Sequence, residues 1–203
     1  LLFDELRKAG ERGVRVRLLL DDNNTGGLDA ILAGLDAEPN IEVRLFNPFV
    51  IRAPRAIGFV TDFFRLNRRM HNKSFTADSQ ATIVGGRNVG DEYFDAVTGD
   101  ALLFADLDVL AVGPIVRDVS ADFDRYWASA SWYPVDSLLP AVTQVDKFEA
   151  RVAGLESDAA ATAYMSAIRN STVMAGALEG SLPFEWAPTG MVSDDPAKGL
   201  GLA

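Results

Sequence analysis

The sequence predicts an α/β domain, and three consecutive segments lead to that prediction. Residues 14–21 alternate and then run apolar, as strands of a buried parallel sheet do. Residues 28–37 read as a helix, and residues 41–46 as a second strand that closes at Asn47 and Pro48. A strand, a helix and a strand joined by short loops predict a right-handed crossover and parallel pairing. With 203 residues, 48% of them hydrophobic, the chain is long enough for one sizeable core.

The elements on either side of this unit are predicted from the same patterns. Residues 1–10 are expected to form an amphipathic helix that ends at Gly10. Three more strands are expected, at 70–77, 80–84 and 106–112. The pattern then becomes helical, at 115–129, 140–153 and 158–170. We therefore expect an α/β lobe over residues 1–135 and a helical connector over residues 136–203.

Composition and charge narrow the class of partner. The formal net charge of −10 argues against a general nucleic-acid-binding protein. The sequence has no cysteine, so neither a disulfide framework nor thiol chemistry is expected. No run of about 18 apolar residues occurs, and no segment of this sequence is therefore predicted to span a membrane.

The segment between Phe49 and Arg69 has a different character from the rest of the chain. Asp62 is its one acid, against five arginines at 52, 55, 65, 68 and 69, and aromatic and aliphatic residues lie between them. Arginines mixed with such residues suit the headgroup zone of an anionic bilayer. Lipid headgroups are thus predicted partners of three of them, Arg52, Arg55 and Arg65. The alternative is that the apolar side chains pack on the domain while the arginines are solvated.

His71 and Lys73 form the main chemical feature of the sequence. If they lie on a strand, the period of two puts both side chains on the same face. An imidazole nucleophile or base then lies beside a fixed cation, which suits a phosphodiester: Lys73 neutralises phosphate oxygens while His71 attacks phosphorus. His71 is the single histidine of the sequence, so we expect neither a metal site nor a second imidazole from this chain.

A Gly-Gly-Arg-Asn segment at 85–88 extends this candidate site. Gly85 and Gly86 allow close backbone approach to an anion, and Asn88 adds a side-chain donor. No cofactor is expected. The polar loop at 21–24 follows a strand end, where open α/β sheets place ligands. A haloacid-dehalogenase-type phosphatase would need Asp-x-Asp there, whereas the chain has Asp-Asn-Asn at 22–24, so we interpret the loop as a rim without a metal role.

The spacing His-x-Lys-x4-Asp at 71–78, with Gly-Gly-x-Asn at 85–88, resembles the signature of the phospholipase D superfamily. Four further segments resemble its cardiolipin synthase branch, close to the C type, at 13–25, 40–48, 67–73 and 106–113. The resemblance implies a mixed sheet flanked by helices, and two lobes that each carry one such motif. This chain has one motif. We therefore expect a first lobe, with residues 184–198 leading towards a missing second lobe and a strand missing before residue 1.

The resemblance also implies roles for the candidate residues. Phosphatidyl transfer in this family needs no metal and passes through a phosphohistidine, with one histidine from each lobe. Lys73 and Asn88 are expected to hold phosphate oxygens beside His71. Asp106 matches the position that holds the imidazole tautomer, and Asp108, on the same face, is the second choice. A further acid, Asp78, is expected to stabilise the turn after the motif strand.

These expectations describe a peripheral enzyme at the bacterial inner membrane, acting on phospholipids at an anionic surface. Phosphatidylglycerol is the implied acceptor, and a second phospholipid is the implied donor. Two alternatives stay open at this point. A single-motif chain can act as a homodimeric phosphodiesterase or nuclease, with one histidine from each copy, or as an inactive scaffold lobe. The acidic composition argues against the nuclease.

Overall fold

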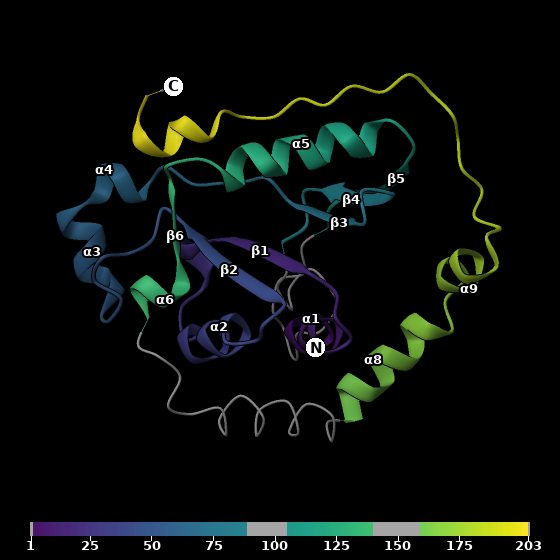
Figure 1. Cartoon of the computed structure of the whole chain (residues 1–203), viewed down its shortest axis with the longest axis horizontal. Coiled ribbons are helices and arrows are strands. Elements are labelled where there is room, and N and C mark those ends of the chain that lie inside the picture. Colours follow the sequence, from purple (N-terminus) through teal and green to yellow (C-terminus); the bar gives the residue numbers. More distant parts are fainter. Residues whose placement is uncertain (1, 89–104, 140–158, 203) are drawn as a thin grey trace. The chain divides into compact units, whose positions relative to one another are not determined.

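The computed structural model describes residues 2–88, 105–139 and 159–202, and the chain divides into two compact units (Figure 1). The first unit contains residues 1–20, 24–45 and 133–188, and the second contains residues 21–23, 46–132 and 189–203. The predicted α/β class with helices beside the sheets is confirmed. The described strands form two three-stranded sheets, with the orders β1-β2-β6 and β3-β4-β5.

The first unit contains the predicted strand–helix–strand. Its elements are β1 (Val16–Asp21), α2 (Asp29–Asp36) and β2 (Ile41–Phe46), and a short 3-10 turn, η1 (Asp22–Asn24), follows β1. The N–H of Val16, which begins β1, donates to the carbonyl of Asn40, just before β2, over 2.8 Å. The two strands therefore start side by side, as parallel pairing requires. The third strand is β6 (Trp132–Pro134), and α6 (Val135–Leu138) follows it.

The core of this unit forms between the apolar face of helix α2 and the apolar face of strand β2. Leu32 and Leu35 of α2 lie three residues apart on one helix face, while Val43 and Leu45 of β2 alternate with exposed or half-buried neighbours. All four are fully buried, together with Val135 of α6. The first helix, α1 (Leu2–Glu11), runs one residue beyond the predicted end at Gly10. Gly10 is instead a packing position inside the helix, because a Cβ there would lie 2.9 Å from the side chain of Ile41.

The second unit is built on an antiparallel sheet. Its strands are β3 (Ser74–Ala77), β4 (Ala81–Gly85) and β5 (Asp108–Val112). In the register, Phe75 pairs with Ile83 and Ile83 with Leu110. The long helix α5 (Ile115–Trp127) packs against all three strands and lies next to them in Figure 1. Thr82, in the central strand, is buried.

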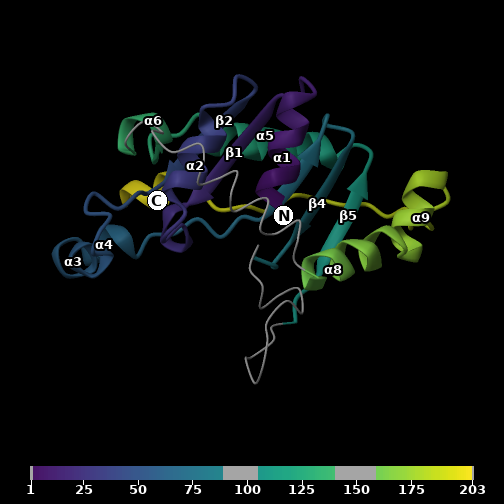
Figure 2. The same cartoon turned by 90° about the horizontal axis from the view of Figure 1, so that it is seen from below.

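Short helices form most of the remaining described chain. The connection predicted over 49–69 contains α3 (Arg55–Thr61) and α4 (Phe63–Leu66), which lie at the end of the second unit away from β4 and β5 (Figures 1 and 2). The predicted helix at 158–170 is confirmed as α8 (Ala159–Arg169), and α9 (Thr172–Glu179) was not predicted. The helix predicted at 140–153 lies outside the described residues. None of the described helices is both long and apolar enough to cross a bilayer.

The C-terminal segment 189–203 packs within the second unit. It contains a 3-10 helix, η3 (Pro196–Leu200). The Ser131 hydroxyl donates to the carbonyl of Pro196 over 3.0 Å, and the Tyr126 hydroxyl donates to that of Asp194 over 3.2 Å. A Cβ on Gly199 would lie 2.8 Å from the ring of Phe46, so this glycine permits close packing. The predicted boundary between residues 135 and 136 stays a prediction.

Candidate active site

His71 and Lys73 lie immediately before β3, at the open end of the β3–β4 hairpin. The strand predicted from residue 70 begins at Ser74, so the two residues precede the regular sheet. The N–H of Gly85 nevertheless donates to the carbonyl of Lys73 over 3.3 Å, which continues the Ser74–Val84 register by one pair. The predicted neighbours Lys73 and Gly85 are therefore brought together. His71 is exposed and Lys73 is half-buried.

The backbone of the motif fixes both side chains in place. The Lys73 ammonium donates to the carbonyl of His71 over 2.8 Å, so its charge is held beside the histidine. The Nδ1 atom of His71 lies 3.4 Å from the carbonyl oxygen of Arg69. With the proton on Nδ1, this nitrogen faces an acceptor and the lone pair of Nε2 is available to a substrate. That tautomer is the one an imidazole nucleophile needs.

Asp21 anchors the chain just before His71. Its carboxylate accepts the N–H of Met70 over 2.7 Å and that of Asn23 over 2.9 Å, and Arg69 donates to it over 3.3 Å. Burial raises the pKa of Asp21, while these backbone bonds and the charges of Arg69 and His71 act in the opposite direction. Sequence reasoning placed Asp21 in a polar rim. Its position at the end of a strand was the signal for a functional location.

Asp194 is a second carboxylate in the electrostatic environment of His71. Its pKa is lowered by a hydrogen bond from Lys198 and by the charge of that lysine, and the charge of His71 acts in the same direction. Asp194 lies in the C-terminal segment 189–203, which sequence reasoning assigned to the connector. Nothing local in the sequence connects it with His71, because 123 positions separate them.

The two glycines of the motif accommodate β5 and the acid that precedes it. A Cβ on Gly86 would lie 2.5 Å from Oδ2 and 2.7 Å from Cγ of Asp106, and a Cβ on Gly85 would lie 2.6 Å from the carbonyl oxygen of Leu107. Glycine is required at both positions because the segment at Asp106 and Leu107 already fills the space that a side chain would occupy. The register also pairs Gly85 with Asp108, so Lys73, Gly85 and Asp108 form one row across the sheet.

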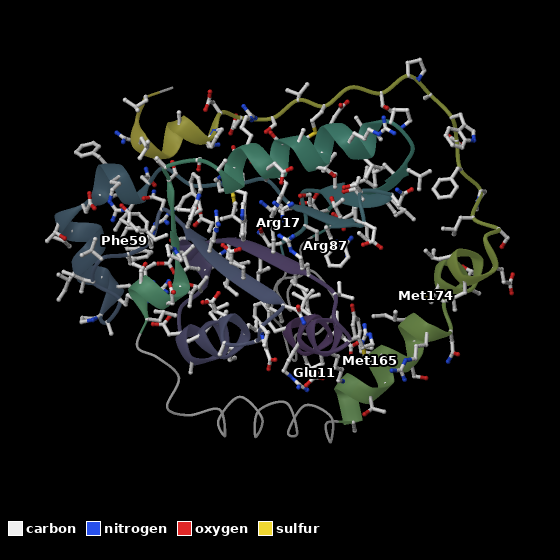
Figure 3. The ribbon with its side chains drawn as sticks, viewed as in Figure 1. Glu11, Arg17, Phe59, Arg87, Met165 and Met174 are labelled. Carbon is white, nitrogen blue, oxygen red and sulfur yellow. The ribbon has the colours of Figure 1, made fainter. Side chains whose placement is uncertain are left out.

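Asp106 and Asp108 are held by neighbours in the same corner of the sheet. The carboxylate of Asp106 accepts the N–H of Leu107 over 2.8 Å. Arg87 donates to the carbonyl of Asp106 over 3.0 Å and forms an ion pair of 2.9 Å with Asp108; its side chain is labelled in Figure 3. A role for Asp106 in holding the His71 imidazole stays a prediction. Asn88, half-buried, follows Arg87 directly.

Asp78 lies at the opposite end of β3 from Lys73. The N–H of Gln80 donates to the carbonyl of Ala77 over 2.9 Å and closes the turn. Both central residues, Asp78 and Ser79, have positive φ, at 50° and 52°, as a type I′ hairpin turn requires. The four residues of β3 lie between Lys73 and Asp78, so five steps of the extended chain, or roughly 17 Å, separate the two. This location supports the expected role in the turn.

The candidate lipid-binding arginines have acceptors inside the second unit. Asp22 is fully buried, and Arg52 donates to both of its carboxylate oxygens, over 2.7 and 3.1 Å. Arg55 donates to Oδ1 of Asp22 over 3.3 Å and to its carbonyl over 2.6 Å. Arg65 donates to the Asn47 side chain over 2.6 Å and also pairs with Asp62.

This arrangement differs from both predicted arrangements of the segment, in which the arginines faced lipid or water. The guanidinium groups point inward, and many apolar side chains point outward. The loop at 21–24, predicted to be a polar rim, supplies the buried partner Asp22. The proposed contact of these arginines with headgroups stays a prediction.

Asn72, between His71 and Lys73, ties the motif to two distant segments. Its amide nitrogen donates to Oδ2 of Asp122 over 3.2 Å and to the Ser193 hydroxyl over 3.1 Å. The Ser193 hydroxyl in turn donates to Asp122 over 2.9 Å, and Arg125 donates to the other oxygen of that carboxylate over 2.6 Å. Sequence reasoning missed these residues. Helix α5 and the C-terminal segment therefore fix the backbone on which His71 and Lys73 lie.

Comparisons with known proteins agree with the motif. The family model described as "Cardiolipin synthase, PLD-like domain" matches residues 1–127. Cardiolipin synthase C of Escherichia coli K12 is 54% identical over 205 residues, covering 100% of this chain and 43% of that protein. An uncharacterized protein of Helicobacter pylori is 43% identical over 143 residues, covering 68% of this chain and 28% of the relative. Cardiolipin synthase B of Salmonella typhimurium is 31% identical over 118 residues, covering 58% of this chain and 26% of that protein. The chain spans less than half the length of these relatives.

Proposed function

Because this chain belongs to the cardiolipin synthase family with a phospholipase D-like domain, we propose that it is one lobe of a phosphatidyltransferase that forms cardiolipin. The observation that supports this most is the fixed pair at the hairpin end. The Lys73 ammonium lies 2.8 Å from the His71 carbonyl, Gly85 ends the adjacent strand, and Gly86 follows it directly. A phosphodiester needs a nucleophile and a cation at one place, and this pair supplies both.

In the proposed first step, Nε2 of His71 attacks the phosphorus of a donor phospholipid. A phosphorus–nitrogen bond forms, the bond to the leaving alcohol breaks, and that alcohol takes up a proton from a general acid. Lys73 neutralises the charge that builds on the non-bridging oxygens, and the amide of Asn88 donates hydrogen bonds to them. In the second step, the hydroxyl of phosphatidylglycerol attacks the phosphorus of the phosphohistidine. The hydroxyl proton passes to the group that acted as general acid in the first step, the phosphorus–nitrogen bond breaks, and His71 is released.

The general acid must come from outside this chain if it is an imidazole, because the chain has one histidine. A second lobe with its own motif is the proposed source, since the chain covers 43% of the length of the related cardiolipin synthase C. We place the enzyme at the bacterial inner membrane as a peripheral protein. Its substrates are then phospholipids of that membrane.

The test uses the complete protein and labelled phosphatidylglycerol in mixed micelles. Wild-type protein is expected to form labelled cardiolipin, and His71→Ala is expected to lower the rate by at least about a thousandfold, as removal of a catalytic nucleophile does. Ser74→Ala, at the exposed first residue of β3, is the matched control and should retain the rate. Cardiolipin formation by His71→Ala at the wild-type rate would overturn the proposal. Turnover of single-stranded DNA instead of lipid would favour the homodimeric nuclease.

A further inference from the structure

The segment from Val50 to Phe64 presents mostly apolar side chains to the solvent. Seven large apolar side chains in it are exposed, namely Val50, Ile51, Ile57, Phe59, Val60, Phe63 and Phe64. Three of them are almost fully exposed: Val50 at 84%, Val60 at 86% and Phe64 at 82%. We refer to these seven side chains as the α3–α4 surface; Phe59, labelled in Figure 3, lies on α3.

The charged residues of the same segment all have internal partners. Arg52 and Arg55 keep 13% and 17% of their side chains exposed, and both pair with the buried carboxylate of Asp22. Asp62 pairs with Arg65, three residues further on. When this surface enters a medium of low dielectric constant, no unpaired charge therefore has to lose its water.

The packing below the α3–α4 surface fixes it in this orientation. Phe49 and Leu66, the last residue of α4, are buried, and a Cβ on Gly58 of α3 would lie 3.1 Å from the Phe49 ring. The guanidinium groups of Arg55 and Arg69 lie 4.9 and 5.1 Å from the centre of that ring. The space under α3 is therefore filled, and the outward apolar side chains cannot turn into the core.

A group of seven exposed large apolar side chains within fifteen residues is unusual on a soluble monomer and marks a contact site. We infer that the α3–α4 surface inserts into a lipid bilayer, at the depth of the boundary between headgroups and acyl chains. Three observations favour lipid over a protein partner. The charges of the segment are paired with one another or with Asp22, and Asp62, whose side chain is 40% exposed, is paired with Arg65. The helices of 7 and 4 residues suit interfacial insertion, and the proposed function, on which this inference rests, requires access to phospholipids.

The surface is also directly connected to the candidate active site. Helix α4 ends at Leu66, and His71 follows five residues later, which is at most about 18 Å of extended chain. The connecting backbone is held at both ends: Asn47 donates to the carbonyls of Arg65 and Arg68 over 2.8 and 2.6 Å, and Asp21 accepts the N–H of Met70. Insertion of the α3–α4 surface would thus hold the catalytic histidine close to the headgroups.

The first test measures binding of the complete protein to vesicles of phosphatidylethanolamine and phosphatidylglycerol. The double variant Val60→Ser, Phe64→Ser should weaken partitioning by about tenfold or more. Each replacement removes an apolar side chain, and the free energy of transferring that side chain from water into the bilayer is then lost. Binding should persist in about 1 M salt, since screening acts on charges and not on apolar contacts. The control Val192→Ser, at a 95% exposed valine in the C-terminal segment, should bind like wild type.

The second test does not depend on the stability of the double variant. In the complete protein, Phe64→Trp should add tryptophan fluorescence that brominated acyl chains quench, whereas Val192→Trp should add fluorescence that they do not quench. Equal quenching at both positions, or unchanged partitioning of a folded Val60→Ser, Phe64→Ser variant, would overturn the inference. So would a loss of dimers in that variant without a loss of vesicle binding, because the surface would then contact a second copy.

Failure of this inference and failure of the proposed function give different results. If the α3–α4 surface inserts but the protein is no cardiolipin synthase, the wild type binds vesicles through this surface and forms no cardiolipin. If the function is correct but the surface does not insert, the double variant keeps wild-type cardiolipin synthesis on vesicles. If both are correct, the variant loses synthesis on vesicles and retains turnover of a water-soluble phosphodiester.

Discussion

Replacing the buried Asp22 by asparagine should destabilise the second unit strongly. The carboxylate is fully buried and accepts the Phe49 N–H over 2.7 Å, besides bonds from Arg52 and Arg55. Asparagine has the same shape but no charge. Its amide nitrogen is a hydrogen-bond donor and would face one of the donors that the carboxylate now binds. Removing one partner of a buried ion pair costs about 3–5 kcal/mol. Since water reaches both guanidinium groups in part, we expect the lower end, about 3 kcal/mol.

For a chain of this size, about 3 kcal/mol corresponds to a fall in Tm of roughly 6–12 °C. The assay is denaturant unfolding followed by tryptophan fluorescence, because Trp127 and Trp132 both lie in the second unit. Asp118→Asn, at an exposed acid of α5, is the matched control and should change stability by less than about 0.5 kcal/mol. A loss below about 1 kcal/mol in Asp22→Asn would refute the reasoning that the arginines are held internally.

Three further predictions concern the motif and the first helix. Lys73→Met should lower cardiolipin synthesis by about a hundredfold or more, as loss of one electrostatic contact in an active site does, while Tm stays within a few degrees; a large fall in Tm would show that Lys73 is structural. Asn72→Ala should lose about 1–2 kcal/mol through its bonds to Asp122 and Ser193 and should lower kcat more than it raises KM; unchanged kinetics would contradict a positioning role. Burial raises the pKa of Asp4, but hydrogen bonds and charges of Lys8 and Arg7 outweigh it, so the pKa is below its ordinary value. The ionised Asp4 therefore stabilises the fold at pH values above its unfolded pKa of about 3.9, and this stabilisation is lost as the pH falls through the lower folded pKa. Asp4→Asn should thus lower Tm at pH 7 but have little effect on Tm at a pH below the folded pKa. An equal loss at both pH values would refute this explanation.

Local periodicity was enough to predict β1, β2 and α2, whereas the third strand of the first sheet, β6, was not predicted. Leu32 and Leu35 mark one face of α2, and Val43 and Leu45 alternate along β2. The strands β3 and β4 and the helix α5 were also predicted, whereas the pairing of β3 with β4 as a hairpin was not. Helix α9 was missed although Ser171 caps its start and Gly180, at φ 67°, follows its end. Its small residues give a weak apolar pattern, so the caps were the better signal.

Interactions between distant positions could not be predicted from the sequence. The arginine-rich segment was interpreted from its composition, which shows charge but not the partner of each charge. The partner Asp22 lies 30 positions before Arg52, and it turns the segment so that arginines face inward and apolar residues outward. In the candidate site, the motif gave His71 and Lys73, because their spacing is local. The bond from Asn72 to Ser193, 121 positions away, had no local signal.

The decisive measurement is whether His71 carries the phosphatidyl group during turnover. The complete protein would be mixed with labelled donor phospholipid, quenched within milliseconds to seconds, and digested for mass spectrometry under conditions that preserve phosphohistidine. If His71 is the nucleophile, a phosphatidyl adduct forms on the peptide that contains His71, disappears when excess phosphatidylglycerol is added, and never forms in His71→Ala. An adduct on a different residue, together with wild-type turnover in His71→Ala, would show that His71 is not the nucleophile.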